Sequence, residues 1–200
     1  MQTEQIIRSK ELFSQFGGTL RTSQALQLGI HPRTLYEMRD KGDIVQLSRG
    51  IYRLTEAPKS EHTDLAAIAA RVPTGVICLI SALSFHQLTD EIPHQVYLAI
   101  PRGKETPRVD YPPARSFHFS AETINAGVEV HEIEGIKVRI FSPEKTIADC
   151  FKFRHKIGLD VTVTALKECL RQKGARAKIL EYAKLCRVEK VMRPFLEALQ

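Results

Sequence analysis

The stretch from Thr22 to Leu54, TSQALQLGIHPRTLYEMRDKGDIVQLSRGIYRL, predicts two short helices separated by a tight turn and followed by a β-hairpin. Thr22 is expected to cap the first helix, because its hydroxyl can accept a hydrogen bond from a free backbone N–H of the first turn. Gly29 is expected to end that helix, since glycine adopts the left-handed conformation of a C-cap without steric cost. Pro32 suits the first position of the second helix, where no intrahelical N–H bond is needed.

The second helix is expected to run to about Lys41 and to end at Gly42. Leu35 and Met38 share one face at the i, i+3 spacing, so this face is expected to pack inward. The opposite side carries the polar residues Arg33, Thr34, Tyr36, Glu37 and Lys41. This division is typical of a helix that is packed on one side and open on the other.

Two strands, 44–47 and 51–54, are predicted after the helices, joined by Ser48-Arg49-Gly50. Upstream, residues 4–16 have the apolar periodicity of an amphipathic helix. Residues 19–21 predict a short extended link that can supply a third strand. Together these elements predict a winged helix-turn-helix.

A winged helix-turn-helix binds DNA by placing its second helix in the major groove, where the first residues reach base edges. Arg33 can read a guanine, whereas Thr34 and Tyr36 can hold phosphates. Arg49 at the hairpin tip, followed by Gly50, can enter the minor groove or clamp a phosphate. The residues predicted to bind DNA are Thr22, Ser23, His31, Arg33, Thr34, Tyr36, Glu37, Lys41 and Arg49. The alternative is a small helical module whose polar face is solvated or contacts another protein.

The composition is that of an ordinary globular protein, with 200 residues, 43% hydrophobic and 26% charged. No apolar run approaches the roughly 20 residues that a membrane span requires. The polar N-terminus is unlike a signal peptide, so a cytoplasmic location is expected. The four cysteines, Cys78, Cys150, Cys169 and Cys186, are far apart and form no CxxC pair. They predict reduced thiols, with no disulfide framework and no metal site.

Positive charge is concentrated in the last quarter of the chain. Residues 151–200 carry 12 Lys or Arg and 5 Asp or Glu, for a net charge of +7. Lys173, Arg176 and Lys178 can add phosphate contacts, since neutralising phosphates releases counterions. The same residues can instead meet an acidic protein, or simply be solvated.

The segment 56–60 contains a proline among polar residues and predicts a linker. We therefore expect a DNA-binding domain at 1–56 and a second domain at 61–200. In the second domain, helices are expected at 61–71, 81–88, from 142 onward, and near 159–172, 174–186 and 188–199, with strands at 76–78, 95–100, 116–119, 128–133 and 136–141. Ser81 is expected near a helix cap, and Ser142 with Pro143 is expected to open another helix. The predicted class is α+β, with a mixed α/β second domain that ends in several helices.

The chain also carries a resemblance to a family in five quoted segments. These are GIHPRTLYEMRDKGDIVQLSRGIYRL, ISALSFHQLTDEIP, VYLAIPRG, GIKVRIFSPEKTIADCFKFR and MRPFLEAL. In this order they resemble the AbiEi antitoxins and transcriptional regulators of abortive-infection, type IV toxin–antitoxin systems. The resemblance implies a cytoplasmic protein whose first domain binds inverted repeats in operator DNA and represses its own operon. It implies that the second domain opposes a nucleotidyltransferase toxin without a stable complex. By position, Arg33, Thr34, Tyr36 and Arg49 fall in the recognition helix and wing.

Two enzyme classes are alternatives to this interpretation. A metal-dependent nuclease acting on nucleic acid needs clustered carboxylates and a lysine, and the nearest set is Glu129, Glu132, Glu134 and Lys137. A Ser–His hydrolase needs a triad, but Ser84 and His86 are two residues apart on a predicted helix and do not face each other. No phosphate-cradling GxxxxGK[ST] loop is present. We therefore expect no enzyme activity and no cofactor, with the nuclease and a protein-interaction regulator as alternatives.

Overall fold

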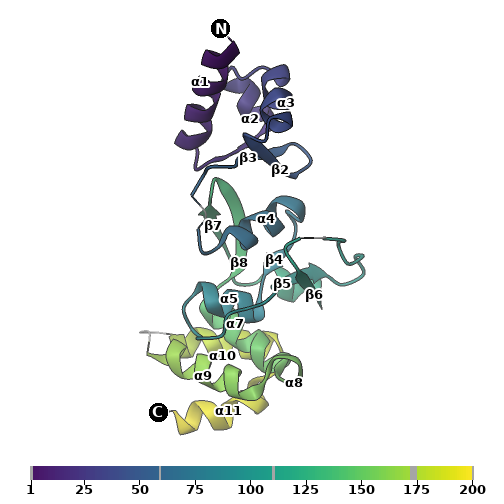
Figure 1. The fold of residues 1–200 in the computed structure, drawn as a ribbon. Coiled ribbons are helices and arrows are strands. Elements are labelled where there is room, and N and C mark those ends of the chain that lie inside the picture. The colour runs from purple at the N-terminus through teal and green to yellow at the C-terminus, as the bar shows by residue number, and fades with distance from the viewer. Residues whose placement is uncertain (1, 59, 110, 172–174, 200) are drawn as a thin grey trace. The chain divides into compact units, whose positions relative to one another are not determined.

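The computed structural model describes residues 2–58, 60–109, 111–171 and 175–199, and it shows a mixed α/β protein with two sheets (Figure 1). The chain divides into two compact units. Unit 1 comprises Met1–Pro73 and His131–Val138, and unit 2 comprises Thr74–Val130 and Arg139–Gln200. The division into a DNA-binding domain at 1–56 and a second domain at 61–200 stays a prediction.

Unit 1 contains the winged helix-turn-helix that the sequence predicts. Its elements are α1 (Gln2–Gln15), β1 (Thr19–Arg21), α2 (Thr22–Gln27), α3 (Pro32–Asp40), β2 (Ile44–Ser48), β3 (Ile51–Leu54) and α4 (Thr63–Arg71). The three strands form an antiparallel sheet in the order β1-β3-β2. In Figure 1, α1, α2 and α3 gather at one end of this sheet. The link at 19–21 is therefore the third strand of the wing.

The core of the winged helix is built from one face of each element. Phe13 from α1, Leu20 from β1, and Leu35 with Met38 from α3 are buried. Ile30 in the turn between the helices is buried with them. The predicted inward face of α3 is therefore the packed face, and removing these side chains from water stabilises the unit.

The start of α2 differs from the prediction, because Thr22 is not its cap. Arg21 holds the cap position, and its backbone N–H donates to Gln24 Oε1 at 3.0 Å. Thr22 is instead the first helical residue, and its hydroxyl donates to the carbonyl of Gly50 at 3.2 Å. The Thr22 hydroxyl is not available as a helix cap because the wing turn lies directly against this end of α2 and accepts its hydrogen bond. The predicted end at Gly29 is confirmed by its positive φ of 86°.

A β-hairpin from later in the chain completes unit 1. Its turn consists of Glu134 and Gly135, both with positive φ, at the position where the sequence predicts a hairpin. A Cβ on Gly135 would lie 2.5 Å from the carbonyl oxygen of Phe16, so only glycine fits there. The side chain of Glu134 forms an ion pair with Arg53 of β3, Nε to Oε2, at 2.8 Å. This contact joins segments about eighty positions apart in the chain.

Unit 2 contains a five-stranded mixed sheet followed by helices. The strands of the sheet are β4 (Val76–Ile77), β5 (Val96–Pro101), β6 (Ala114–Phe119), β7 (Val128–Ile133) and β8 (Ile136–Phe141), of which β7 and β8 are the two arms of the hairpin. The helices are α5 (Leu79–Phe85), α6 (Ala121–Asn125), α7 (Pro143–Lys152), α8 (Arg154–Ile157), α9 (Leu159–Leu170), α10 (Ala175–Leu185) and α11 (Glu189–Ala198). The strand order is β6-β5-β4-β8-β7. The pairs β4–β8 and β5–β6 are parallel, whereas β4–β5 is antiparallel.

Two short helices, α6 and α8, were not predicted, because each has fewer residues than a clear helical period requires. Ser81 was expected near a cap but lies inside α5, where its hydroxyl accepts the backbone N–H of Tyr97 at 2.9 Å. Ser142 does cap α7, since its side chain accepts from the Lys145 N–H, and Pro143 follows it as predicted. No helix in the described part of the chain is both long and apolar enough to cross a membrane.

Candidate nucleic-acid interface

The outward face of α3 carries the side chains predicted for the DNA groove, with one exception. Arg33 and Tyr36 are exposed, and Glu37 is partly exposed. Thr34 was expected on the solvent side but is only 8% exposed. It lies one helical turn before the buried Met38, so the helical period places it on the packed side, where it lines a pocket with residues of α1.

Ion pairs neutralise most charges on this helix. Lys41 Nζ lies 2.7 Å from Glu37 Oε1, one turn away. Arg39 pairs with its neighbour Asp40 at 2.8 Å and lies over the ring of Tyr36, 5.3 Å from the centroid. Within the described chain, Arg33 has no carboxylate partner. The strongest uncompensated positive charge of α3 is therefore at its first turn, which is the end that reaches base edges in a helix-turn-helix.

The wing presents a second uncompensated cation. Arg49 lies in the turn between β2 and β3 and is exposed. The next residue, Gly50, has a φ of 73°, and its carbonyl accepts hydrogen bonds from both the backbone N–H and the hydroxyl of Thr22. These bonds fix the wing turn against the start of α2, where Ser23 is exposed.

Arg21 was missed by the sequence reasoning. It ends β1 opposite Ile51 in the sheet register, is exposed, and pairs with no carboxylate in the described residues. Because the next residue, Thr22, is bonded to Gly50, the backbone at Arg21 lies beside the wing turn. The available signal was a lone basic residue directly before the first helix of the motif.

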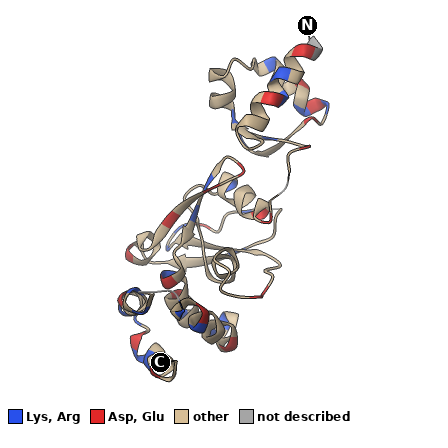
Figure 2. Cartoon of the chain, turned by 90° about the vertical axis from the view of Figure 1, so that its left-hand side faces the viewer, with Lys and Arg blue, Asp and Glu red and all other residues tan. Residues whose placement is uncertain are grey.

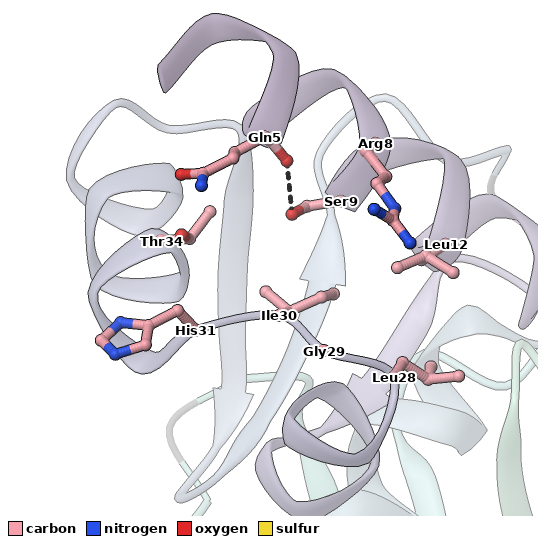
Figure 3. Close-up of a pocket in the computed structure, with 9 residues that line it drawn as sticks. All are labelled: Gln5, Arg8, Ser9, Leu12, Leu28, Gly29, Ile30, His31 and Thr34. Atoms are coloured by element: carbon pink, nitrogen blue, oxygen red, sulfur yellow. Dashed lines mark hydrogen bonds between the residues drawn. The ribbon is translucent and has the colours of Figure 1, made fainter. Parts of the chain in front are cut away.

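A shallow pocket of about 280 Å³ lies between α1 and the start of α3. Its lining residues are Gln5, Arg8, Ser9, Leu12, Leu28, Gly29, Ile30, His31 and Thr34. In Figure 3 the Gln5 side chain points from α1 toward Thr34, and the Arg8 side chain points toward Leu12. The His31 ring points away from Arg8. His31 caps α3 by accepting the Arg33 backbone N–H on Nδ1 at 3.2 Å. Of these residues, sequence reasoning named only His31 and Thr34 as candidates for binding.

The predicted basic tail is less uniform than its sequence charge suggests. Figure 2 shows Lys and Arg interleaved with Asp and Glu along the C-terminal helices. Lys178 lies 3.4 Å from Glu144, and Arg176 is only partly exposed. Lys173 falls outside the described residues. A phosphate contact by these side chains stays a prediction.

Of the carboxylates considered for a nuclease, Glu134 is held by other contacts. Glu134 Oε1 accepts hydrogen bonds from the Ser60 N–H at 2.8 Å and the Thr63 hydroxyl at 2.5 Å, while Oε2 faces Arg53. Burial alone raises the pKa of Glu134, but these hydrogen bonds and the Arg53 charge outweigh it and lower the pKa. In the described ranges, no group of three His, Cys, Asp or Glu side chains is placed to hold a metal ion. The geometry therefore gives the glutamate a structural role.

The histidine considered for a Ser–His hydrolase is also held by a contact. His86 Nε2 lies 2.8 Å from the carbonyl oxygen of Phe141. All four cysteines are buried and unpaired. Burial raises the pKa of the Cys169 and Cys186 thiols to about 12, which leaves them un-ionised and poorly nucleophilic.

Helix α3 has one polar exposed face and one buried apolar face, and the wing adjoins it. This arrangement defines a winged helix-turn-helix of the kind found in transcription regulators. Residues 8–55 match the family model described as "Transcriptional regulator, AbiEi antitoxin". This match confirms the resemblance for that segment, and it supports an antitoxin or regulator role.

One solved structure extends the likeness in fold over most of the chain. The crystal structure of the RV2827C protein from Mycobacterium tuberculosis has a TM-score of 0.51 and 15% sequence identity, covering 90% of this chain and 75% of the other. At this identity the likeness concerns the fold alone. No curated protein sequence matches the chain.

Proposed function

We propose that this protein is a sequence-specific DNA-binding repressor that acts on its own operator through α3 and the wing. The observation that carries the proposal is the division of α3, in which Leu35 and Met38 are buried while Arg33 and Tyr36 are exposed. The family description of residues 8–55 supports the same role. An operator with inverted repeats, bound by two copies, fits the way such domains pair on DNA.

Within this proposal each exposed side chain has a chemical task. Arg33 offers the paired donors that guanine O6 and N7 accept. Tyr36 and Arg49 hold backbone phosphates, and Ser23 beside the wing adds a hydroxyl contact. Glu37 and Lys41 face the groove edge as an ion pair. If either side chain contacted a base or a phosphate, this ion pair would have to break.

The test is a footprint of the purified protein on the promoter upstream of its own gene, followed by titration of the Arg33→Ala variant. Loss of a base contact is expected to weaken operator binding by about 1–3 kcal/mol and to relax the preference at one base pair. Arg193→Ala is the matched control, because Arg193 is an exposed arginine on α11 in unit 2. A footprint that is absent at every protein concentration would refute the repressor role, whereas unchanged affinity on substitution would remove only Arg33 from it.

We further propose that the second domain, 61–200, acts as the antitoxin against a separate nucleotidyltransferase toxin, without a stable complex and without enzyme activity of its own. The AbiEi description of residues 8–55 and the similarity in the order of the later segments support this role. Co-expression with a nucleotidyltransferase encoded beside the gene should restore growth that the toxin alone arrests. Growth arrest that persists at high antitoxin levels would contradict it, as would magnesium-dependent cleavage of nucleic acid by the pure protein.

A further inference from the structure

We propose that the open edge of strand β6 binds an acidic extended segment of a partner protein, which adds to the sheet of unit 2 as a further strand. β6 is the last strand on one side of that sheet, next to β5 (Figure 1). This edge lies in unit 2, whereas the proposed DNA contacts belong to α3 and the wing in unit 1. Binding at the edge therefore does not depend on the repressor function.

The backbone hydrogen bonds of β6 show which of its groups face the open side. The carbonyl of Pro113 accepts the Val96 N–H at 2.8 Å, and the carbonyl of Phe119 accepts the Arg102 N–H at 2.7 Å. Both bonds run toward the β5 side, so the odd-numbered residues of this segment direct their backbone groups inward. The N–H and C=O groups that point away from the sheet are therefore those of Ala114, Ser116 and His118.

These outward groups have no partner in the described part of the chain. The backbone of β6 pairs only with β5, and no turn or loop residue bonds to the outward N–H and C=O groups. The loop before the strand touches it through a side chain instead, since His118 Nε2 donates to the Lys104 carbonyl at 3.2 Å. A row of free donors and acceptors at every second residue is the template that an added strand uses.

Two cations border this edge on one face of the sheet. Arg115 and Phe117 are two positions apart on the strand, so they share that face. Arg115 Cζ lies 5.3 Å from the ring centroid of Phe117, and Lys156 Nζ of α8 lies 5.8 Å from the same centroid. Both cations are exposed, and neither has a carboxylate partner among the residues that the structure describes.

The position of these cations defines the chemistry of the added strand. Its side chains would alternate between the two faces of the sheet. Those opposite Arg115 and Phe117 would lie beside the two cations, where carboxylates form favourable cross-strand pairs. Those opposite Ser116 would lie on the other face, where neutral side chains fit. The edge therefore fits a segment with Asp or Glu at every second position, and its charge hinders pairing with an arbitrary strand.

The same edge is poorly suited to two other occupants. Nucleic-acid phosphates would meet the cations, but they only accept hydrogen bonds, and the outward carbonyls of β6 need donors. A second copy paired antiparallel about Ser116 would bring both copies of Arg115 and Lys156 together on one face, and like charges oppose such pairing. A peptide supplies both donors and acceptors along its backbone, and it can carry the negative charge.

The experiment titrates the full ¹⁵N-labelled chain with a peptide of about eight residues in which Glu and Val alternate. Strand addition is expected to shift the amide signals of Ala114, Ser116 and His118 and to slow their hydrogen exchange, whereas the inward amides of Arg115 and Phe117 change less. The same peptide with every backbone nitrogen methylated keeps its charge but loses its donors, so it should bind roughly tenfold more weakly.

Charge-reversal variants test the cations separately from the backbone. Arg115→Glu should weaken binding of the Glu–Val peptide by roughly fivefold to tenfold and should favour a peptide of alternating Lys and Val. Lys156→Glu, on another element, should move the preference in the same direction and keeps the test open if the first variant folds poorly. Arg187→Glu is the matched control, because Arg187 is exposed and has no carboxylate partner in the described ranges. It should leave both titrations unchanged.

Three results would overturn strand addition. One is the absence of any amide shift along β6 at peptide concentrations up to about 1 mM. Another is equal binding of the methylated peptide or of single-stranded oligothymidylate, which would show a surface for polyanions in general. The third is the alternating pattern of amide shifts appearing on dimerisation of the chain alone, which would make a second copy the occupant. A missing operator footprint would refute the repressor role and leave this titration unaffected.

Discussion

At the scale of single residues, the buried pair of Arg53 and Glu134 links distant segments of unit 1. Their side chains are 5% and 7% exposed. Arg53 also donates to the carbonyl of Pro58 at 2.9 Å, and Glu134 accepts from Ser60 and Thr63. Two residues that look like ordinary surface charges in the sequence therefore hold β3, the segment after it and the hairpin turn together.

We expect Glu134→Ala to lower the free energy of unfolding by about 3 kcal/mol, because it leaves a buried guanidinium without its counter-charge. Urea unfolding followed by circular dichroism measures the change. Glu132→Ala, two residues away and exposed, should change stability by less than about 0.5 kcal/mol. Equal effects of the two substitutions would show that the ion pair is dispensable.

The same glutamate predicts a pH dependence. Its pKa is lower in the folded chain than the ordinary value near 4.5. A depressed folded pKa stabilises the protein above the unfolded pKa, and this contribution is lost as the pH falls through the folded pKa. Stability should therefore fall more steeply below about pH 4.5 in wild type than in Glu134→Gln. Parallel curves between pH 3 and pH 6 would contradict this expectation.

At the scale of the element, α7 combines a well-formed local start with a buried charge pair. Ser142 and Pro143 begin the helix as the sequence predicts. One turn apart on its inner face, Lys145 and Asp149 are fully buried, 2.5 Å apart from Nζ to Oδ2. The ammonium also lies 4.2 Å from the ring centroid of Phe141. Burial raises the pKa of Asp149, and the lysine counteracts this effect.

Replacing Lys145 by methionine should cost about 3–5 kcal/mol of unfolding free energy, because the Asp149 carboxyl is then buried without its partner. The double variant Lys145→Met with Asp149→Leu should recover most of that loss, since an apolar pair of similar volume often replaces a buried ion pair without penalty. Chemical denaturation of the three proteins gives the comparison. A double variant no more stable than the single one would show that the pair is needed for packing.

At the scale of the whole molecule, the winged helix depends on chain segments that lie far beyond it in sequence. Unit 1 includes α4, whose Ala70 carbonyl accepts the Ser48 hydroxyl of β2 at 3.1 Å. It also includes the hairpin turn at residues 131–138. A sequence-based domain of residues 1–56 contains neither segment.

A fragment of residues 1–56 is therefore expected to melt at least about 10 °C below the winged helix of the full chain, since a loss of about 1 kcal/mol lowers Tm by roughly 4–8 °C in a domain of this size. Thermal unfolding, with an added tryptophan at exposed Tyr36 as the local probe, compares the two. Identical melting temperatures would show that the contacts of Glu134 and α4 add no stability to the motif.

The sequence by itself determined the local geometry of this protein. Pro32 and Gly29 delimit helices through steric rules that act within a few residues, and the spacing of Leu35 and Met38 defines an inner face through the helical period. The same kind of local rule found the hairpin turn at Glu134-Gly135. These features were predictable because each depends only on neighbours in the chain.

Only the tertiary structure decided which polar groups are available for binding. Thr34 is buried against α1, Thr22 is bonded to the wing, and Glu134 is committed to Arg53. It also placed Arg8 beside the first turn of α3. Burial and charge pairing depend on groups brought together from distant parts of the chain, and no periodicity within a single segment records which distant partner will arrive.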